Sequence, residues 1–274
     1  MKNNAIILVL LICGSVAFSQ KDRTYKSFES AEKNPTAVYH LKVVFKKLDS
    51  IPRSIGKMVN LETLELNNNH LARLPDEICE LINLKELNLF HNILKTLPSN
   101  MGNLKKLEKL IVSSNDLVTL PVSFGSLSSL KQFSAKDNKL IYLPQEFSQL
   151  KKLEQLFLSY NQLDSLPNRI GNLHFLEQLY LEHNQLKKLP QSANNFANMK
   201  FFYLGKNLFD DMPLAICYMT QLQELDISYC GALGVLPDCL KNIVLLDKLY
   251  LDSNVSLPFS QSLFHNPNLQ VITR

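Results

Sequence analysis

The side chains that most often carry catalysis have no catalytic spacing in this chain. None of its six histidines stands in an HExxH pattern or at another paired ligand spacing. The cysteines form no CxxC pair, the serines have no GxSxG setting, and no phosphate-binding loop occurs among the eight glycines. The sequence therefore predicts a protein that is not an enzyme and that uses no metal and no cofactor.

Acidic residues recur at one fixed spacing, as paired catalytic carboxylates could. Glu62, Glu108, Glu154 and Glu177 each stand one residue after an evenly spaced leucine, and lysines alternate with them. This mixture favours a solvated column of opposite charges over a catalytic pair. The net charge of +4 comes from 29 basic and 25 acidic residues without basic blocks, so the composition does not favour a nucleic-acid partner.

The evenly spaced leucines belong to a repeat that fills most of the chain. Units follow the rule LxxLxLxxNxLxxLPxxIGxLxx every 23 residues, with one interval of 24, as in LETLELNNNHLARLPDEICELIN at residues 61–83. The units open at Val38, Leu61, Leu84, Leu107, Leu130, Leu153, Leu176, Met199, Leu222 and Leu246, and an eleventh opens at Leu269.

This pattern resembles the leucine-rich repeat family, in the 23-residue class of plant Ras-group and scaffold-type proteins, here in an exported, bacterial-type chain. The resemblance implies an α/β solenoid, a right-handed leucine-rich-repeat horseshoe with a parallel concave sheet and an irregular or short-helical convex side. The residues favour the same architecture. The LxL segment alternates apolar and polar residues as a half-buried strand does, and no unit can bury its leucines without neighbours.

Each strand is followed by a turn residue whose side chain can bond the backbone groups that a sharp bend leaves unpaired. Stacking predicts a ladder of these residues: Asn69, Asn92, Asn115, Asn138, Asn161, Asn184, Asn207, Cys230 and Asn254. Cysteine replaces asparagine at position 230, which the repeat rule allows. Two other cysteines, Cys217 and Cys239, fall on the return segments of adjacent repeats, so a disulfide between them is allowed by the spacing.

We expect four parts in the chain. Residues 1–19 are a signal peptide, residues 20–37 an N-terminal cap with a short helix, residues 38–268 ten repeats, and residues 269–274 a terminal strand. In the N-terminal cap, residues 24–36 are expected to hold a short helix that stops at Asn34-Pro35, with Tyr25, Phe28 and Ala31 on one face. In the terminal strand, Leu269 and Ile272 keep the phase of the repeat.

The first residues, MKNNAIILVLLICGSVAFSQ, have the basic start, apolar run and small-residue cleavage site of a secretory signal. The apolar run is too short for a membrane span. We expect cleavage after Ser19 and export to a periplasmic, cell-surface or secreted location. A lipid anchor at Cys13 is an alternative, although the bulky Ile12 precedes it where a lipoprotein signal has a small residue.

The repeat rule leaves the exposed strand positions free to vary, and these become aromatic in the second half of the chain. The middle strand position reads Lys42, Glu65, Asn88, Ile111, Ser134, Phe157, Tyr180, Tyr203, Asp226 and Tyr250. Adding the neighbouring columns gives a predicted binding site on the concave face: Phe157, Tyr160, Tyr180, His183, Phe201, Tyr203, Tyr229 and Tyr250.

The sequence thus predicts a recognition module that holds a protein or peptide partner on its concave face. The rings are expected to anchor the partner, while nearby charges select it: Glu182, Lys206, Glu224, Asp226 and Asp252. Stacking of the rings on one another, without a ligand, is the simplest alternative. Glycan binding and an adhesive or structural role in the cell envelope are the alternatives at the level of function.

Overall fold

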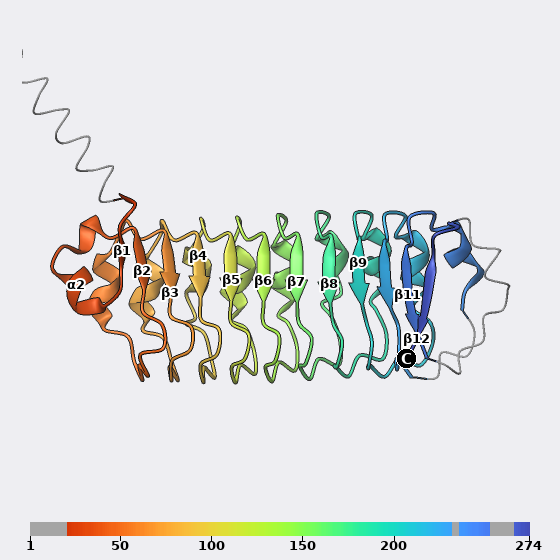
Figure 1. Ribbon diagram of the computed structural model, residues 1–274, viewed down its shortest axis with the longest axis horizontal. Coiled ribbons are helices and arrows are strands. Elements are labelled where there is room, and N and C mark those ends of the chain that lie inside the picture. The colour runs from red at the N-terminus through yellow and green to blue at the C-terminus, as the bar shows by residue number, and fades with distance from the viewer. Residues whose placement is uncertain (1–20, 232–235, 253–265) are drawn as a thin grey trace, which may run out of the picture.

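The computed structural model describes residues 21–231, 236–252 and 266–274 as a long stack of repeats (Figure 1). Its 12 strands form one parallel sheet and lie in the order of the sequence, from β1 to β12. This confirms the predicted solenoid with a parallel sheet on one side. The predicted signal peptide, Cys13 and Asn254 lie outside the described residues.

The strands are short and regularly spaced along the chain. They are β1 (Thr24–Tyr25), β2 (His40–Lys42), β3 (Thr63–Glu65), β4 (Glu86–Asn88), β5 (Lys109–Ile111), β6 (Gln132–Ser134), β7 (Gln155–Phe157), β8 (Gln178–Tyr180), β9 (Phe201–Tyr203), β10 (Glu224–Asp226), β11 (Lys248–Leu251) and β12 (Gln270–Thr273). Equivalent repeat positions pair across the sheet, so that Leu87 lies between Leu64 and Leu110.

Short 3₁₀ helices form the opposite layer, behind the strands in Figure 1. They are η1 (Pro35–Ala37), η2 (Arg53–Lys57), η3 (Asp76–Glu80), η4 (Met101–Asn103), η5 (Val122–Ser126), η6 (Gln145–Gln149), η7 (Ile170–Asn172), η8 (Gln191–Asn195), η9 (Leu214–Tyr218) and η10 (Asp238–Asn242). The layers stack closely. A Cβ atom on Gly125 would lie 2.2 Å from the carbonyl oxygen of Glu146, so this position in η5 has room for glycine alone.

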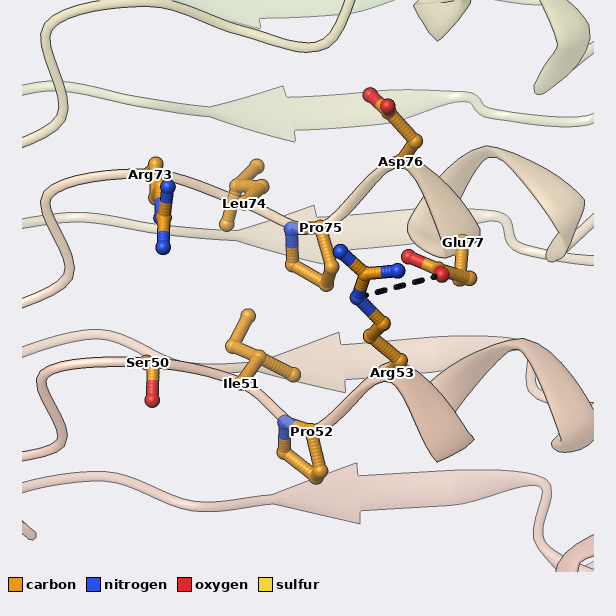
Figure 2. A pocket seen from close by; sticks show the side chains of 9 residues that line it. All are labelled: Ser50, Ile51, Pro52, Arg53, Arg73, Leu74, Pro75, Asp76 and Glu77. Atoms are coloured by element: carbon orange, nitrogen blue, oxygen red, sulfur yellow. Dashed lines mark ion pairs between the residues drawn. The ribbon is translucent and has the colours of Figure 1, made fainter.

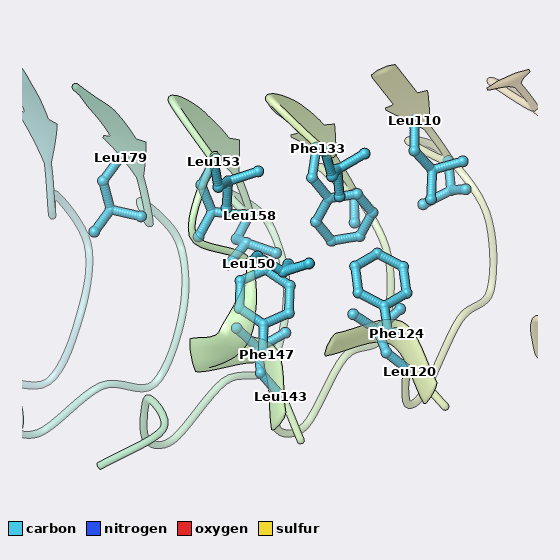
Figure 3. Close-up of a cluster of buried hydrophobic side chains, with 14 of the residues drawn as sticks. Leu110, Leu120, Phe124, Phe133, Leu143, Phe147, Leu150, Leu153, Leu158 and Leu179 are labelled. Atoms are coloured by element: carbon cyan, nitrogen blue, oxygen red, sulfur yellow. The ribbon is translucent and has the colours of Figure 1, made fainter. Parts of the chain in front are cut away.

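One hydrophobic core runs between the two layers, from Tyr25 to Leu251. Its centre holds three buried rings, which Figure 3 shows between the strands and the outer helices. Phe133 comes from β6, while Phe124 and Phe147 come from η5 and η6. The ring centroids of Phe124 and Phe133 lie 4.8 Å apart, and those of Phe124 and Phe147 lie 5.7 Å apart. The repeats therefore share a single interior, as evenly spaced leucines require.

The ladder asparagines are buried at the turns after the strands. In each, Nδ2 donates to a carbonyl of the preceding repeat and to one in its own repeat, while Oδ1 accepts from a backbone N–H of the preceding repeat. This holds for Asn69, Asn92, Asn115, Asn138, Asn161, Asn184 and Asn207. At position 230, the Cys230 thiol donates to the carbonyl of Leu204 at 2.9 Å.

The residue before each ladder position adopts a left-handed backbone conformation. Its φ angle lies between 54° and 59° in nine successive repeats, although none of these residues is glycine. They are Phe45, Asn68, His91, Ser114, Asp137, Tyr160, His183, Lys206 and Tyr229. Such angles cost energy for most side chains, so the stack imposes this conformation at every turn.

The N-terminal cap differs from the expectation at Tyr25, which lies outside the short helix. Thr24 and Tyr25 instead form β1, which pairs with β2 and places the Tyr25 ring in the core. The short helix is α2 (Phe28–Glu32), and Ser27 caps it by accepting a hydrogen bond from the Ser30 amide. The open edge of β2 explains the difference, because its backbone groups gain partners when the preceding segment extends beside them.

The terminal strand pairs one residue away from the expected phase. Leu249 lies beside Val271, and Tyr250 lies beside Ile272. Since alternate residues of a strand face opposite sides, this shift moves Ile272 from the core side to the side of Tyr250. Val271 packs against the core in its place.

The described cysteines divide into one pair and two single thiols. Cys217 of η9 and Cys239 of η10 form a disulfide, with Cα atoms 5.4 Å apart. Cys79 and Cys230 are buried and free. Burial raises the pKa of Cys79 to about 11, so this thiol is protonated at neutral pH.

Candidate partner-binding site

Four rings from the ends of β7, β8, β9 and β11 form a row on the open side of the sheet, which we call the aromatic column: Phe157, Tyr180, Tyr203 and Tyr250. The 23-residue register sets Phe157 beside Tyr180 and Tyr180 beside Tyr203. Ring centroids are 5.0 Å apart in the first pair and 4.5 Å apart in the second, which is nearly parallel at 11°. All four rings are half-buried, so one face of the row remains open.

Asp226 interrupts this column between Tyr203 and Tyr250, whose centroids are 6.3 Å apart. We expected Asp226 to be an exposed charge that selects a partner, but it is only 2% exposed. Its Oδ1 accepts hydrogen bonds from the amide and the hydroxyl of Ser228, and its Oδ2 pairs with Arg274 at 2.8 Å. A carboxylate that is buried with this many partners cannot meet a ligand unless Arg274 moves.

A second row lies at the left-handed corner beside the strands. Tyr160 and His183 stack with centroids 4.0 Å apart, and the Lys136 ammonium lies 5.3 Å from the Tyr160 ring. Tyr229 stands further along this row, under Lys206 at 5.8 Å. The rings of Tyr160 and Tyr229 are 47% and 50% exposed, which makes this row the more accessible of the two.

Phe201 is the predicted site residue outside both rows. It is the first residue of β9 and pairs in register with Gln178 and Glu224. Its ring is half-buried. The structure therefore brings most predicted residues into two parallel rows and leaves Phe201 as a flank of the aromatic column.

Tyr203 is fixed by a polar network at its hydroxyl. The hydroxyl donates to the Glu224 carboxylate, whose other oxygen pairs with Lys248 at 2.8 Å. Burial works against ionisation of Glu224, but the hydrogen bonds from Lys248 and Tyr203 outweigh it and lower the pKa. Burial and the Glu224 charge raise the pKa of Tyr203. The ring therefore presents a neutral hydroxyl in a fixed orientation.

Glu182 lies beside the aromatic column, and its carboxyl is harder to ionise than that of Glu224. Burial raises the pKa of this carboxyl, although the Ser159 hydroxyl donates to it and opposes the shift. The equivalent position in the next repeat is Gly205, where a Cβ atom would lie 3.1 Å from Oδ1 of Asp226, so the backbone is packed closely against that carboxylate. The site therefore combines ring faces and carboxyl groups.

The column of alternating charges that the sequence suggested is formed by ion pairs between neighbouring repeats. Lys85 lies 2.7 Å from Glu62, and Lys131 lies 2.8 Å from Glu108. The hydrogen bond from Lys131 lowers the pKa of Glu108. These carboxylates are held ionised by lysines at the surface, which is unlike a pair that exchanges protons with a substrate.

One hollow lies away from the rings, on loops that lead from the strands to the outer helices. It has a volume of about 590 Å³, and its walls are residues 50–53 and 73–77 (Figure 2). Arg53 and Glu77 close one side as an ion pair at 3.7 Å. A hollow of about 340 Å³ repeats this arrangement beside residues 187–191. Because it recurs at equivalent positions, we interpret it as a furrow between stacked turns.

The described residues hold no group of three or more histidine, cysteine, aspartate or glutamate side chains that could bind a metal ion. Within the same parts of the chain, no helix has the length and apolar character needed to cross a bilayer.

Two features of the site escaped sequence reasoning. The pairing of Asp226 with Arg274 joins residues 48 positions apart, which no repeat rule connects. The left-handed corner under Tyr160 and His183 had a signal, since asparagine, aspartate and histidine occupy three further positions of that column in Asn68, Asp137 and His91. These residue types tolerate positive φ better than others.

Comparison with known proteins shows which families and solved structures share this architecture. A family model described as leucine-rich repeat matches residues 59–117, 105–163 and 143–186, and a second matches residues 221–243. Among solved structures, a leucine-rich repeat protein of Leptospira interrogans is 30% identical, with a TM-score of 0.64 over 92% of this chain and 76% of its own. Comparison with curated proteins gave no match.

Two further solved structures share the fold at lower identity. The functional domain of InlJ from Listeria monocytogenes is 20% identical, with a TM-score of 0.73 over 90% of this chain and 50% of its own. The ectodomain of the plant membrane receptor kinase GASSHO1/SCHENGEN3 from Arabidopsis thaliana, in complex with CASPARIAN STRIP INTEGRITY FACTOR 2, is 24% identical, with a TM-score of 0.61 over 91% and 37%. The matched repeats and the 30% identical structure show that this chain belongs to the leucine-rich repeat family.

Proposed function

We propose that this chain is an exported, non-enzymatic binding module that holds a protein or peptide partner against the aromatic column of its concave face. The observation that carries the proposal is the line of Phe157, Tyr180 and Tyr203, stacked at 5.0 Å and 4.5 Å with one side open. Self-stacking accounts for the contacts between the rings. It does not account for the side left open to solvent, and aromatic rings are enriched at the centres of interfaces.

Rigidity gives this surface its use. The rings stand on strands whose register is fixed by the repeats, and Glu224 orients the hydroxyl of Tyr203. A partner that binds here therefore meets side chains already in position and loses less entropy on binding. The second row, with Tyr160 stacked on His183, widens the contact area beside the column.

Two observations support export. The first residues have the features of a secretory signal. The disulfide between Cys217 and Cys239 is of a kind that persists in oxidising compartments and is rare in the cytosol. The plant ectodomain in complex with CASPARIAN STRIP INTEGRITY FACTOR 2 supports the use of this fold to hold a protein ligand. The 23-residue repeat also resembles the plant Ras-group class, whose intracellular setting does not fit a secretory signal.

The test is capture of partners from an envelope extract of the native host. We expect the doubly substituted variant Tyr180→Ala with Tyr203→Ala to lose the captured proteins that the wild type retains. The matched control carries Asn88→Ala with Ser134→Ala, at the same strand position in earlier repeats, and should capture the same set as the wild type. An unchanged set with the tyrosine variant would show that the column is not the anchor.

Glycan binding is the second candidate, because the tyrosine faces lie beside carboxylates that could bond sugar hydroxyls. The chain has no tryptophan, which is the strongest sugar-stacking side chain. Hits on a glycan array that vanish in the Tyr180→Ala, Tyr203→Ala variant would favour this candidate over a peptide partner. An adhesive or structural envelope role predicts instead that substitutions in the column leave every binding assay unchanged.

A further inference from the structure

The aromatic column ends at a contact made by the chain's own Arg274. Its Nη1 lies 2.8 Å from Oδ2 of Asp226, and its Cζ lies 4.5 Å from the centroid of the Tyr250 ring. The arginine side chain is 47% exposed, whereas the aspartate side chain is 2% exposed. The guanidinium thus pairs with a buried carboxylate, packs on the Tyr250 ring, and remains partly exposed to solvent.

The surroundings of Asp226 are organised to receive a cation. The amide and the hydroxyl of Ser228 both bond to Oδ1, at 2.9 Å and 2.6 Å, which fixes the carboxylate and leaves Oδ2 to face Arg274. A carboxylate beside an aromatic face suits a guanidinium in particular. The planar group can bond to the oxygen and stack on the ring at the same time.

The charges around Asp226 also favour a cation. Burial raises the pKa of Glu182, and the nearby charge of Asp226 raises it further. Glu224 carries its own partner, Lys248, at 2.8 Å. A basic group therefore complements this end of the column, whereas an acidic group would be repelled.

We propose that Asp226 and Tyr250 form a guanidinium subsite, which Arg274 fills in the free protein and an arginine side chain of the bound peptide fills in the complex. The proposal rests on the function proposed above and names a feature of the partner. Arg274 directly follows β12, and its side chain is exposed enough to leave without unpacking the core. The resident arginine acts as a competitor, so its occupancy lowers the apparent affinity for the incoming one.

The probe is N-acetyl-arginine methylamide, and the matched control is the citrulline analogue, which has nearly the same shape but no charge. Binding is followed by calorimetry and by tyrosine fluorescence, which is free of tryptophan signal in this chain. We expect Arg274→Ala to bind the arginine probe about tenfold more tightly than the wild type does. This factor applies if Arg274 occupies the subsite about nine-tenths of the time in the wild type, because the probe then binds only the remaining tenth of the molecules. Adding Asp226→Asn to Arg274→Ala should abolish the gain, and citrulline should bind neither protein.

Thermal unfolding keeps the proposal testable if Arg274→Ala is unstable. In that case the arginine probe should raise the melting temperature of Arg274→Ala towards that of the wild type, and the citrulline analogue should not. Equal affinity of wild type and Arg274→Ala for the arginine probe, or equal effects of arginine and citrulline, would overturn the subsite. These assays need no natural partner. If the arginine-probe assays fail but partner capture is still lost in the Tyr180→Ala, Tyr203→Ala variant, the subsite is wrong and the proposed function holds. If the probe assays succeed but capture does not depend on these tyrosines, the proposed function is wrong and the subsite holds.

Discussion

The side chain of Asn138 donates a hydrogen bond from Nδ2 to the carbonyl of Val112, 3.0 Å away across the boundary between two repeats. Its Nδ2 also reaches the carbonyl of Ala135 at 3.1 Å, and its Oδ1 accepts from the amide of Leu117 at 3.0 Å. One buried amide thus satisfies three backbone groups, two of them in the neighbouring repeat. Because leucine packing has no direction, this ladder fixes how successive repeats are oriented.

Replacing Asn138 with alanine should lower the free energy of unfolding by about 1–3 kcal/mol. The substitution leaves the amide of Leu117 without a partner in the interior, while the carbonyls of Val112 and Ala135 keep their bonds from Asn115 and Asn161. A buried group without a partner costs about 1–3 kcal/mol before relaxation. Urea denaturation followed by circular dichroism measures the change. The control is Gln162→Ala, next to a ladder position but exposed, which should stay within about 0.5 kcal/mol of the wild type. Equal stability of the two variants would contradict a structural ladder.

The left-handed corner gives a second prediction at Ser114, whose φ is 54°. Asparagine tolerates this conformation, whereas a β-branched side chain clashes with its own backbone there. We expect Ser114→Val to be less stable than Ser114→Asn by about 1–2 kcal/mol in urea denaturation. Both variants lose the hydrogen bond from the Ser114 hydroxyl to Asp137, so the loss of that hydroxyl is common to the two proteins. Equal midpoints would show that the corner relaxes freely.

The repeat spacing predicted the sheet because each unit places its leucines beside those of the next. Leu64, Leu87 and Leu110 lie together for this reason. The same reasoning was wrong where the repeat ends. Tyr25 pairs with the free edge of β2, and Ile272 lies in β12, which pairs with β11 one residue out of the repeat phase.

In the candidate site, too, the contacts set by the repeat were predictable and the contacts made outside it were not. The 23-residue period predicted that Phe157, Tyr180 and Tyr203 form one row, since all three occupy the same repeat position. It could not predict the burial of Asp226 against Arg274, because Arg274 follows β12, which lies outside the repeat phase. Pattern reasoning works for positions that the stack makes equivalent. It misses contacts that a single repeat makes once.

The disulfide gives a third prediction. Cys217 and Cys239 are separated by 22 residues, and a crosslink of this span stabilises a fold by about 3 kcal/mol through the entropy of the unfolded chain. Reduction with dithiothreitol should therefore lower the thermal midpoint of the wild type. The doubly substituted Cys217→Ser, Cys239→Ser protein should start lower and should not respond to the reductant. A reductant effect of equal size in both proteins would assign it to another group.

The stacked pair of Tyr160 and His183 makes stability depend on pH in a defined direction. Burial lowers the pKa of His183 in the folded protein, and the nearby Lys206 and Lys136 lower it further, from an ordinary value of 6.5. As the pH falls below about 6.5, the unfolded chain therefore takes up the proton first. This group's contribution to stability is fully present above that pH and is lost as the pH falls through the lower folded pKa.

We expect the free energy of unfolding to fall between pH 7 and pH 5 more steeply in the wild type than in His183→Gln, measured by urea denaturation at each pH. Lys206→Met should give an intermediate slope, because it removes one of the two cations that depress the pKa while keeping the length of the side chain. The direct check is the NMR titration of the His183 ring, whose midpoint should lie below 6.5 in the wild type and rise in Lys206→Met. A midpoint at or above 6.5 would mean that Tyr160 holds the ring in its charged form, by a cation–π contact that outweighs burial.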